Sequence, residues 1–254
     1  MPSRERHNAR MPATFFVPSS SISADSRVLL PQDEARHAVR VLRKKRGDEV
    51  CVVTGEGVWY RVCLEEVTIQ RVTGHIVETR ADVGEPSYHL SIGLALLKNR
   101  SRFETFLEKA VELGVSEIIP LETSRTETSL FRQARARHIM ISAMKQCGRS
   151  RLTRLRAPEQ LLQLLEAPAW NTAFLAHEQA DPAETLAEAL RGCASHARLR
   201  ILVGPEGGFT DNEVLAAENS GYRVVSLGPR RLRAETAALS AAATVMMSMH
   251  TPSA

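Results

Sequence analysis

The sequence predicts an α/β protein, in which a small β-rich domain of barrel type precedes a larger domain with a parallel sheet. Short β-branched and aromatic runs, punctuated by glycines, occupy residues 12–80. From residue 89 onward, apolar runs of strand length alternate with helical patterns, which is typical of a parallel sheet. Residues 81–88, with Gly84 and Pro86, form a linker candidate between these two parts.

The first domain is predicted from three strand-like runs and one helix. Two of the runs flank Gly55-Glu56-Gly57, which indicates a hairpin. Asp33 begins an amphipathic stretch whose apolar residues recur at helical spacing, so we expect a helix there. The predicted strands are Val50–Thr54, Val58–Leu64 and Thr73–Val77.

The second domain is predicted as five strands alternating with five helices. Gly114 ends the first helix, and Asp181 with Pro182 indicates the start of the third. The predicted strands are His89–Leu97, Val115–Leu121, Thr172–Ala176, Leu199–Val203 and Tyr222–Leu227. The predicted helices are Arg102–Leu113, Phe131–Gln146, Asp181–Arg191, Asp211–Asn219 and Ala234–Met249.

Composition and charge are those of an ordinary globular protein, and they permit binding to a polyanion such as nucleic acid. The formal net charge is +4, which is compatible with nucleic acid without requiring it. The four cysteines have neither disulfide-framework nor zinc-ligand spacing, which favours a reducing compartment and no metal. No apolar stretch approaches the roughly 20 residues of a membrane helix, so we expect a cytoplasmic protein without membrane contact. Residues 1–11 are predicted to be a disordered extension.

Two glycine-containing loops follow buried strands and precede helices. The first is Gly204-Pro205-Glu206-Gly207-Gly208-Phe209, and the second runs from Leu227-Gly228 to Ala237. Ligands of open α/β sheets bind at the carboxyl ends of strands, where such loops lie. The simpler alternatives are an ordinary strand-to-helix turn and a capped buried helix. Neither loop has the spacing of a dinucleotide or triphosphate motif.

Basic residues gather in two runs, one in each predicted domain. The segment 40–46 carries five basic residues in seven, and residues 132–156 carry eight basic residues and no acidic one. Solvated surface is the simpler explanation of one such run. Phosphate binding is the simplest explanation common to both.

Taken together, these motifs resemble those of the SPOUT-superfamily methyltransferases that modify a uridine of 16S ribosomal RNA at ring atom N3. The resemblance extends from about Met11 to Met249 and is most specific in the two glycine loops. Phe103–Gly114 looks like the family's first helix, and Gln146-Cys147-Gly148-Arg149 is similar to its Gln-Ser-Gly-Arg segment, with cysteine in place of serine. The resemblance implies a PUA-like barrel, then a trefoil-knotted parallel sheet with helices on both faces, and a homodimer.

The resemblance also implies S-adenosylmethionine as cofactor and the small ribosomal subunit's 16S RNA as partner. Residues at three strand ends are expected to bind the cofactor: Leu175, His177, Glu178, Gly204, Pro205, Glu206, Gly207, Gly208, Leu227, Gly228, Leu232, Arg233, Glu235, Thr236 and Ala237. Residues expected to contact RNA are Arg40, Arg43, Lys44, Lys45, Arg46, Lys98, Arg125, Gln146 and Arg149.

Methyl transfer to N3 requires that the ring lose a proton, so the site needs a base or cations that stabilise an anionic ring. Arg233, Arg149 and Lys98 are the candidates for such a cation, whereas the general base is not assigned. Glu206 and Glu235 could act as bases, although a capping or loop-fixing role suits each of them better. Two alternatives remain: a methyltransferase for transfer RNA or 23S RNA, and a non-catalytic RNA-binding protein of ribosome assembly. The glycine loops speak against the second, because RNA binding alone does not require them.

Overall fold

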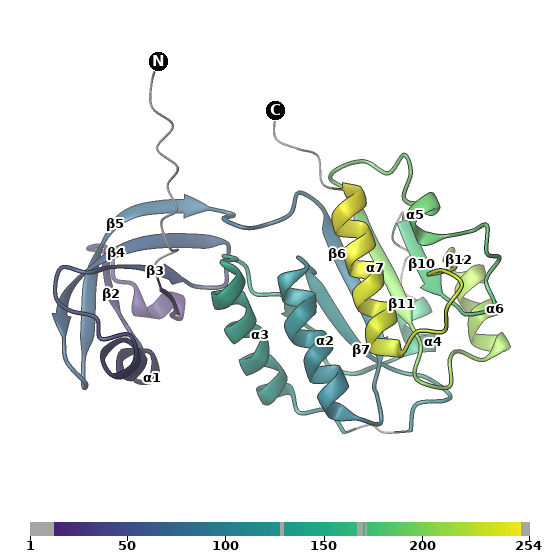
Figure 1. Ribbon diagram of the computed structural model, residues 1–254, viewed down its shortest axis with the longest axis horizontal. Coiled ribbons are helices and arrows are strands. Elements are labelled where there is room, and N and C mark those ends of the chain that lie inside the picture. Colours follow the sequence, from purple (N-terminus) through teal and green to yellow (C-terminus); the bar gives the residue numbers. More distant parts are fainter. Residues whose placement is uncertain (1–12, 128–129, 167–169, 171, 250–254) are drawn as a thin grey trace, which may run out of the picture. The chain divides into compact units, whose positions relative to one another are not determined.

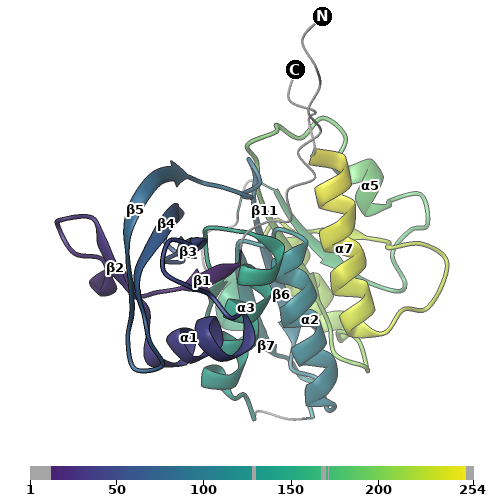
Figure 2. The ribbon, with the colours of Figure 1, turned by 60° about the vertical axis from the view of Figure 1, so that its left-hand side comes forward.

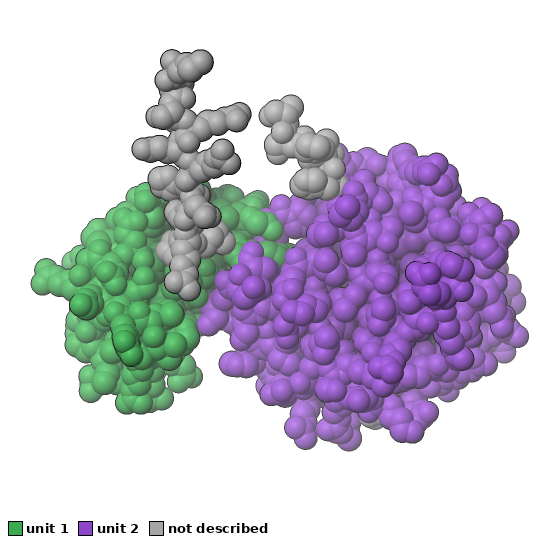
Figure 3. All heavy atoms as spheres, in the orientation of Figure 1, with its two compact units in different colours: residues 1–84, 148–151 green, residues 85–147, 152–254 purple. Residues whose placement is uncertain are grey.

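A computed structural model describes residues 13–127, 130–166, 170 and 172–249 (Figure 1). The chain forms two compact units (Figure 3). Unit 1 combines residues 1–84 with the tetrapeptide Gly148–Arg151, and unit 2 holds residues 85–147 and 152–254. The first crossing between them, after Gly84, lies inside the segment 81–88. The return of Gly148–Arg151 to unit 1 was not predicted, and the predicted extension 1–11 lies outside the described residues.

Unit 1 is built on a curled five-stranded sheet with the strand order β1-β3-β4-β5-β2 (Figures 1 and 2). The hairpin predicted at Gly55–Gly57 is confirmed, because β3 and β4 pair antiparallel on either side of it. Only β1 and β3 pair in parallel. The strands are β1 (Thr14–Phe16), β2 (Arg27–Leu29), β3 (Glu49–Val53), β4 (Val58–Val67) and β5 (Val72–Ala81). The edge strands β1 and β2 were missed, since each has only three residues.

Irregular pairing between β4 and β5 accounts for the curl. The register shifts between Arg61 and Val62 and again between Leu64 and Glu66, and such bulges bend a sheet. At Gly74 a Cβ would lie 2.5 Å from the Cys63 carbonyl oxygen, so only glycine allows the two strands to approach. The curled sheet encloses an apolar core that includes Phe15, Val50 and Leu64.

The helix expected from Asp33 is present as α1 (Gln32–Arg36), continued by one wide turn, η2 (His37–Val41). Ala35 and Ala38 are buried in the core, as the helical spacing predicted. A 3-10 turn, η1 (Ser19–Ser21), lies between β1 and β2.

Backbone hydrogen bonds fix the tetrapeptide Gly148–Arg151 to the rest of unit 1. The Gly57 N–H donates to the Ser150 carbonyl at 3.1 Å, and the Ser150 N–H donates to the Val83 carbonyl at 3.0 Å. The Arg151 guanidinium adds an ion pair with Asp82 at 2.6 Å. These contacts join residues far apart in sequence, so a local sequence pattern cannot predict them.

Unit 2 contains a fully parallel sheet, which confirms the predicted α/β class. Its strand order is β12-β10-β11-β6-β7-β8, with β9 also paired to β7. The strands are β6 (His89–Ala95), β7 (Glu117–Glu122), β8 (Arg154–Leu155), β9 (Glu159–Gln160), β10 (Thr172–Ala176), β11 (Arg198–Val203) and β12 (Arg223–Val225).

Helices cover both faces of this sheet (Figures 1 and 2). On one face lie α2 (Arg100–Glu112), α3 (Gln133–Cys147), α5 (Leu186–Ala189) and α7 (Ala234–Met249). On the other lie α4 (Leu161–Glu166) and α6 (Asp211–Asn219), packed over a core that includes Leu121, Leu175 and Leu202. Small side chains such as Ala238, Ala241 and Ala242 let α7 pack closely on β6 and β11. The threading of the chain through a trefoil knot stays a prediction.

The third predicted helix is wrong in extent. Instead of Asp181–Arg191, α5 covers only Leu186–Ala189. Thr185 is extended, with φ −77° and ψ 151°, because it forms a bridge with Ser226. Asp181 caps a turn instead, accepting a hydrogen bond from the Ala183 N–H at 2.8 Å. The short elements β8, β9 and α4 were missed altogether.

Candidate active site

Three strand ends meet at one edge of the unit 2 sheet. In the parallel register, Ala176 at the end of β10 lies beside Val203 of β11 and Val225 of β12. The segments that leave these strands therefore lie together, as expected of parallel strands with aligned carboxyl ends. They are His177-Glu178, Gly204–Phe209 and Ser226–Arg233.

These segments enclose a cavity of about 400 Å³, a volume in the range of small-molecule sites. Its wall is mixed, with apolar side chains from the strand ends, the two glycine loops and the start of α7, and polar or charged side chains from all three segments. The lining residues are Ala176, His177, Glu178, Val203, Gly204, Pro205, Glu206, Gly208, Phe209, Ser226, Leu227, Gly228, Arg230, Arg231, Leu232, Arg233, Ala234 and Ala237.

The first glycine loop is a tight turn whose shape depends on two of its glycines. Gly208 has φ +70°, and its N–H donates to the Pro205 carbonyl at 2.9 Å. A Cβ on Gly204 would lie 3.1 Å from the Gly208 carbonyl carbon and 3.2 Å from the Phe209 nitrogen. Because both are backbone atoms, the loop could not keep this shape with a side chain at position 204.

A buried carboxylate fixes the exit of this loop into α6. Glu213, 3% exposed, accepts hydrogen bonds from the Thr210 N–H at 2.8 Å and the Thr210 hydroxyl at 3.1 Å, which completes a capping box. Its other oxygen accepts from the Ser124 N–H at 2.8 Å. Burial alone would raise the pKa of Glu213, but the hydrogen bonds from Ser124 and Thr210 outweigh it and hold that pKa below its ordinary value.

Arg125, beside Ser124 in the connection from β7 to α3, also holds the glycine loop. Its Nη1 donates to the Gly207 carbonyl at 2.6 Å and to the Phe209 carbonyl at 3.1 Å. Arg125 was expected to contact RNA, but in this structure its guanidinium is engaged with the backbone of the loop. The β7–α3 connection therefore holds one wall of the cavity in two ways: Arg125 donates to the loop backbone, and the Ser124 N–H donates to Glu213 of α6.

The second loop is held at its start by the connection between β10 and β11. The Ser226 N–H donates to the Glu184 carbonyl at 2.8 Å, and the Leu186 N–H donates to the Ser226 carbonyl at 3.0 Å. Gly228, with φ +107°, then turns the chain toward α7. At the rim, Arg231 pairs with Glu178 at 3.6 Å, whereas Arg230 and Arg233 pair with none of the described carboxylates.

Most of the residues expected to bind a cofactor line this cavity, and four do not. Leu175 is fully buried in the core beneath it. Gly207 faces Arg125, whose Cδ would lie 3.3 Å from an added Cβ. Glu235 pairs with Arg102 at 3.7 Å, and neither it nor Thr236 lines the cavity. Of the two carboxylates considered as bases, only Glu206 therefore borders the cavity.

The residues expected to contact RNA also differ in where the structure places them. Arg149 belongs to the tetrapeptide Gly148–Arg151 of unit 1 and is only 4% exposed, and its contact with RNA stays a prediction. Gln146 is exposed at the end of α3. Lys98 is exposed and pairs with Glu127 at 2.8 Å, and this hydrogen bond raises the pKa of Lys98. Lys98 does not line the cavity.

Sequence reasoning missed several residues that line the cavity. Phe209 and Ala234 lie within the two loops but were not among the residues expected to bind a cofactor, and Ser226 directly follows β12. Arg230 and Arg231 were visible as part of an arginine-rich loop, which was the signal that could have identified them. Among the described residues, no group of His, Cys, Asp or Glu is arranged to hold a metal ion. No helix in the described ranges has the length and apolarity to cross a membrane.

Comparisons with known proteins agree with this geometry. A family model described as an RNA methyltransferase domain matches residues 84–246, and one described as an RNA methyltransferase PUA domain matches residues 30–77. The ribosomal RNA small subunit methyltransferase E of Synechocystis sp. is 32% identical over 216 residues, which are 84% of this chain and 70% of that protein. Its namesake in Mesomycoplasma hyopneumoniae is 30% identical over 207 residues, 79% of this chain and 86% of that protein.

A solved structure shares the whole fold. The crystal structure of a ribosomal RNA small subunit methyltransferase E from Neisseria gonorrhoeae, bound to S-adenosyl methionine, superposes with a TM-score of 0.83 and 28% identity. The match covers 94% of this chain and 98% of that one.

Proposed function

The chain belongs to the RNA methyltransferase family that includes the ribosomal RNA small subunit methyltransferase E proteins, and we propose that it methylates a uridine of 16S ribosomal RNA at N3. It is an S-adenosylmethionine-dependent enzyme. The observation that carries the proposal is the cavity at the ends of β10, β11 and β12, formed by the two glycine loops.

The residues of this cavity fit S-adenosylmethionine. Val203, Phe209 and Leu232 offer apolar surface for an adenine ring, and the space beside Gly204 is one that a Cβ could occupy only by displacing backbone. His177, Glu178 and Glu206 offer polar partners for the ribose and the amino-acid end. When bound, the cofactor supplies an electrophilic methyl group on a sulfonium, so the protein has to supply orientation rather than an electrophile.

In the reaction, the chain's own side chains have to stabilise the negative charge that develops on the uracil ring. When N3 loses its proton, negative charge spreads over the ring oxygens, and nearby cations stabilise it. Arg233 suits this role because it lines the cavity and pairs with none of the described carboxylates. We propose Arg233 as the cation next to the ring, with Arg230 as a second one. Buried Arg149 and the ion-paired Lys98 suit it less.

Family resemblance supports four further proposals, on location, phosphate binding, oligomeric state and topology. Ribosomal RNA as substrate implies the cytoplasm, and its phosphates suit the basic runs. We also propose that the chain is a homodimer and that its sheet is knotted.

Mass mapping of ribosomal RNA tests the function. RNA from a strain lacking this gene should lack one 3-methyluridine in 16S RNA, and a plasmid with the intact gene should restore it. A plasmid encoding Arg233→Gln should restore it poorly, although calorimetry with the purified variant should still show cofactor binding. A methyl group missing from transfer RNA or 23S RNA instead, or no difference at all, would reject the proposal.

A further inference from the structure

A row of buried polar side chains lies toward the amino-terminal ends of the unit 2 strands, away from the cavity at their carboxyl ends. Arg200 of β11 lies between Ala173 of β10 and Ser91 of β6 in the parallel register. Glu117 of β7 lies beyond Ser91, and Tyr222 directly precedes β12, which pairs with β10. The polar members, here called the amino-edge row, are each at most 5% exposed: Ser91, Glu117, Arg200 and Tyr222.

The carboxylates in and beside this row already have partners. Glu117 accepts a hydrogen bond from the Ser91 hydroxyl at 2.9 Å and pairs with Arg154 at 3.7 Å. A second nearby carboxylate, that of Glu159, pairs with Arg156 at 2.6 Å. Neither carboxylate forms an ion pair with the buried arginine of the row.

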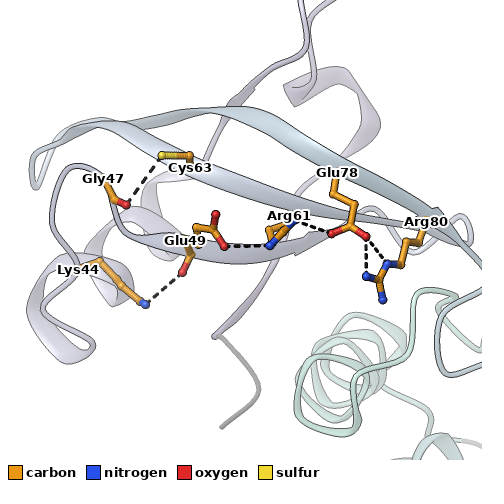
Figure 4. A network of polar contacts seen from close by, with 7 residues as sticks. All are labelled: Lys44, Gly47, Glu49, Arg61, Cys63, Glu78 and Arg80. Atoms are coloured by element: carbon orange, nitrogen blue, oxygen red, sulfur yellow. Dashed lines mark hydrogen bonds and ion pairs between the residues drawn. The ribbon is translucent and has the colours of Figure 1, made fainter. Parts of the chain in front are cut away.

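Arg200 differs in this respect from other arginines of the chain. Figure 4 shows two arginines of unit 1, Arg61 and Arg80, that both pair with Glu78. Arg200 pairs with none of the described carboxylates, and its buried Nε makes no hydrogen bond. A buried charge without a hydrogen-bonded partner is costly, so an unsatisfied guanidinium at this depth indicates a missing acceptor.

A second cation adds to the positive charge at this edge. The Cζ atoms of Arg200 and exposed Arg198 lie 4.5 Å and 4.8 Å from the centre of the Trp170 ring. An aromatic ring stabilises cations but supplies no oxygen acceptor. Burial, followed by the charge of Arg198, lowers the pKa of His89, whose ring also contacts Trp170. Arg198 also lacks a described carboxylate partner, so the edge carries uncompensated positive charge.

A second donor without an acceptor lies beside Arg200. The Tyr222 hydroxyl is buried and makes no hydrogen bond. Burial raises the pKa of Tyr222, although the neighbouring Arg200 acts in the opposite direction, so the hydroxyl keeps its proton. A guanidinium can only donate, and the hydroxyl has a proton to donate. Two neighbouring donors without an acceptor fit a bound group that supplies oxygen lone pairs.

We propose that this edge of unit 2 binds a small oxyanion of the phosphate class, held by Arg200 and Tyr222 and approached from the side of exposed Arg198. An oxyanion supplies negative charge and several acceptors at once, and a guanidinium matches two of its oxygens. Because the two donors are only 5% and 4% exposed, a free anion fits better than the phosphodiester chain of an RNA. The inference goes beyond the proposed function and does not depend on it.

Calorimetric titration of the full chain with inorganic phosphate, at constant ionic strength, tests the site. The wild type should bind phosphate, and Arg200→Met, which removes the charge from a side chain of similar shape, should bind it at least tenfold more weakly. The matched control Arg223→Met removes the same charge from an exposed arginine that pairs with Glu184, and should bind like the wild type. Absent binding by the wild type, or equal affinities of the two variants, would overturn the proposal.

Thermal melting with and without phosphate measures the same site through stability. An anion that binds only the folded chain should raise the melting temperature by roughly 5 °C at a hundredfold excess over its dissociation constant. Phosphate also stabilises proteins because it is excluded from their surfaces, and that part should remain in Arg200→Met. The additional increment should occur in the wild type and in Arg223→Met alone. An equal increment in all three proteins would contradict a specific site.

Two milder variants decide the matter if Arg200→Met does not fold. Tyr222→Phe removes only a hydroxyl group, and Arg198→Gln neutralises an exposed side chain. Each should weaken phosphate binding roughly threefold to tenfold, because one donor to the anion is lost. Binding of S-adenosylmethionine at the opposite edge of the sheet should not change. Wild-type phosphate affinity in both variants would reject the site.

Transcribed 16S RNA separates a free anion from the phosphates of a nucleic acid. Saturating RNA should leave the phosphate affinity of the wild type unchanged, because the buried donors remain available to the small ion. Displacement of phosphate by RNA would assign the edge to the RNA backbone and overturn the proposal of a small anion. Methyl transfer is not the readout of any of these measurements, so their outcome is independent of the proposed function.

Discussion

The Arg125 guanidinium donates to the Gly207 carbonyl at 2.6 Å, which joins two loops 82 positions apart in the sequence. One loop follows β7, and the other forms a wall of the cavity beyond β11. The same Nη1 also reaches the Phe209 carbonyl. Arg125 therefore acts as a positioning residue: it contacts the backbone of the glycine loop and does not line the cavity itself.

Replacing Arg125 should weaken cofactor binding without unfolding the chain. We expect Arg125→Ala to lose about tenfold in affinity for S-adenosylmethionine, since a charge-assisted hydrogen bond contributes about 1.5 kcal/mol. Calorimetry measures the affinity, and guanidinium ion added to the variant should restore part of it. Arg137→Ala, which removes an exposed arginine from α3, serves as the control. Unchanged affinity in folded Arg125→Ala would show that the loop keeps its shape without the brace.

The glycines of the first loop should differ in their sensitivity to a methyl group. Gly204→Ala should lower cofactor affinity by tenfold or more, as its Cβ would press on the backbone at Gly208 and Phe209. Gly207→Ala should have a small effect, because its Cβ would meet only the flexible stem of Arg125 at 3.3 Å. A larger residue at position 207 is expected to lower cofactor affinity by displacing Arg125 rather than by a steric clash with the cofactor. Equal affinities of the two alanine variants would contradict this ranking.

Several elements could be predicted because their signals are local. The α6 boundaries Asp211–Asn219 follow from Thr210 and Glu213, which form a capping box within one turn. Strand β10 and helix α7 also have the predicted bounds, since their apolar patterns end where the chain turns.

Features that depend on distant partners could not be predicted. Thr185 is extended because of its bridge with Ser226, which shortens α5 relative to its local pattern. Arg149 belongs to a tetrapeptide held by residues near Gly57 and Val83. Arg125 stands alone in a polar loop, and its role follows only from the position of Gly207. In each case the deciding contact joins residues whose proximity only the fold reveals.

Glu213 should make stability depend on pH below neutrality. Its folded pKa lies below the ordinary value of 4.5, so the carboxylate stabilises the fold above that pH and the contribution is lost as pH falls through the lowered pKa. Glu213→Gln should cost about 1–3 kcal/mol at pH 7, because a buried acceptor of three hydrogen bonds is weakened. Urea unfolding at pH 7 and near pH 4 measures this. The difference between wild type and variant should shrink at the lower pH, and a constant difference would assign the effect to packing alone.

The last prediction concerns the methylated atom. Methylation at carbon-5 of a pyrimidine usually needs a cysteine that attacks the ring, whereas methylation at N3 does not. No cysteine lies among the residues that line the described cavity. Cys51 and Cys63 belong to unit 1, and burial raises the pKa of the Cys51 thiol to about 11, which disfavours a thiolate. Cys193 follows α5, where its thiol is directed to the Ala189 carbonyl.

Cys147 is the remaining thiol, and its Sγ lies 3.6 Å from the Met144 carbonyl oxygen at the end of α3. We expect Cys147→Ser to keep most of the methyl transfer activity, measured with tritiated cofactor and 16S RNA. RNA containing 5-fluorouridine should form no covalent adduct with the wild-type chain on denaturing gels, because N3 attack leaves the ring carbons untouched. A trapped adduct that disappears in Cys147→Ser would establish ring attack by this cysteine and move the methyl group to carbon-5. If the activity survives in Cys147→Ser but falls at least tenfold in Arg233→Gln, the rate depends on a cation facing an anionic ring, as N3 transfer requires.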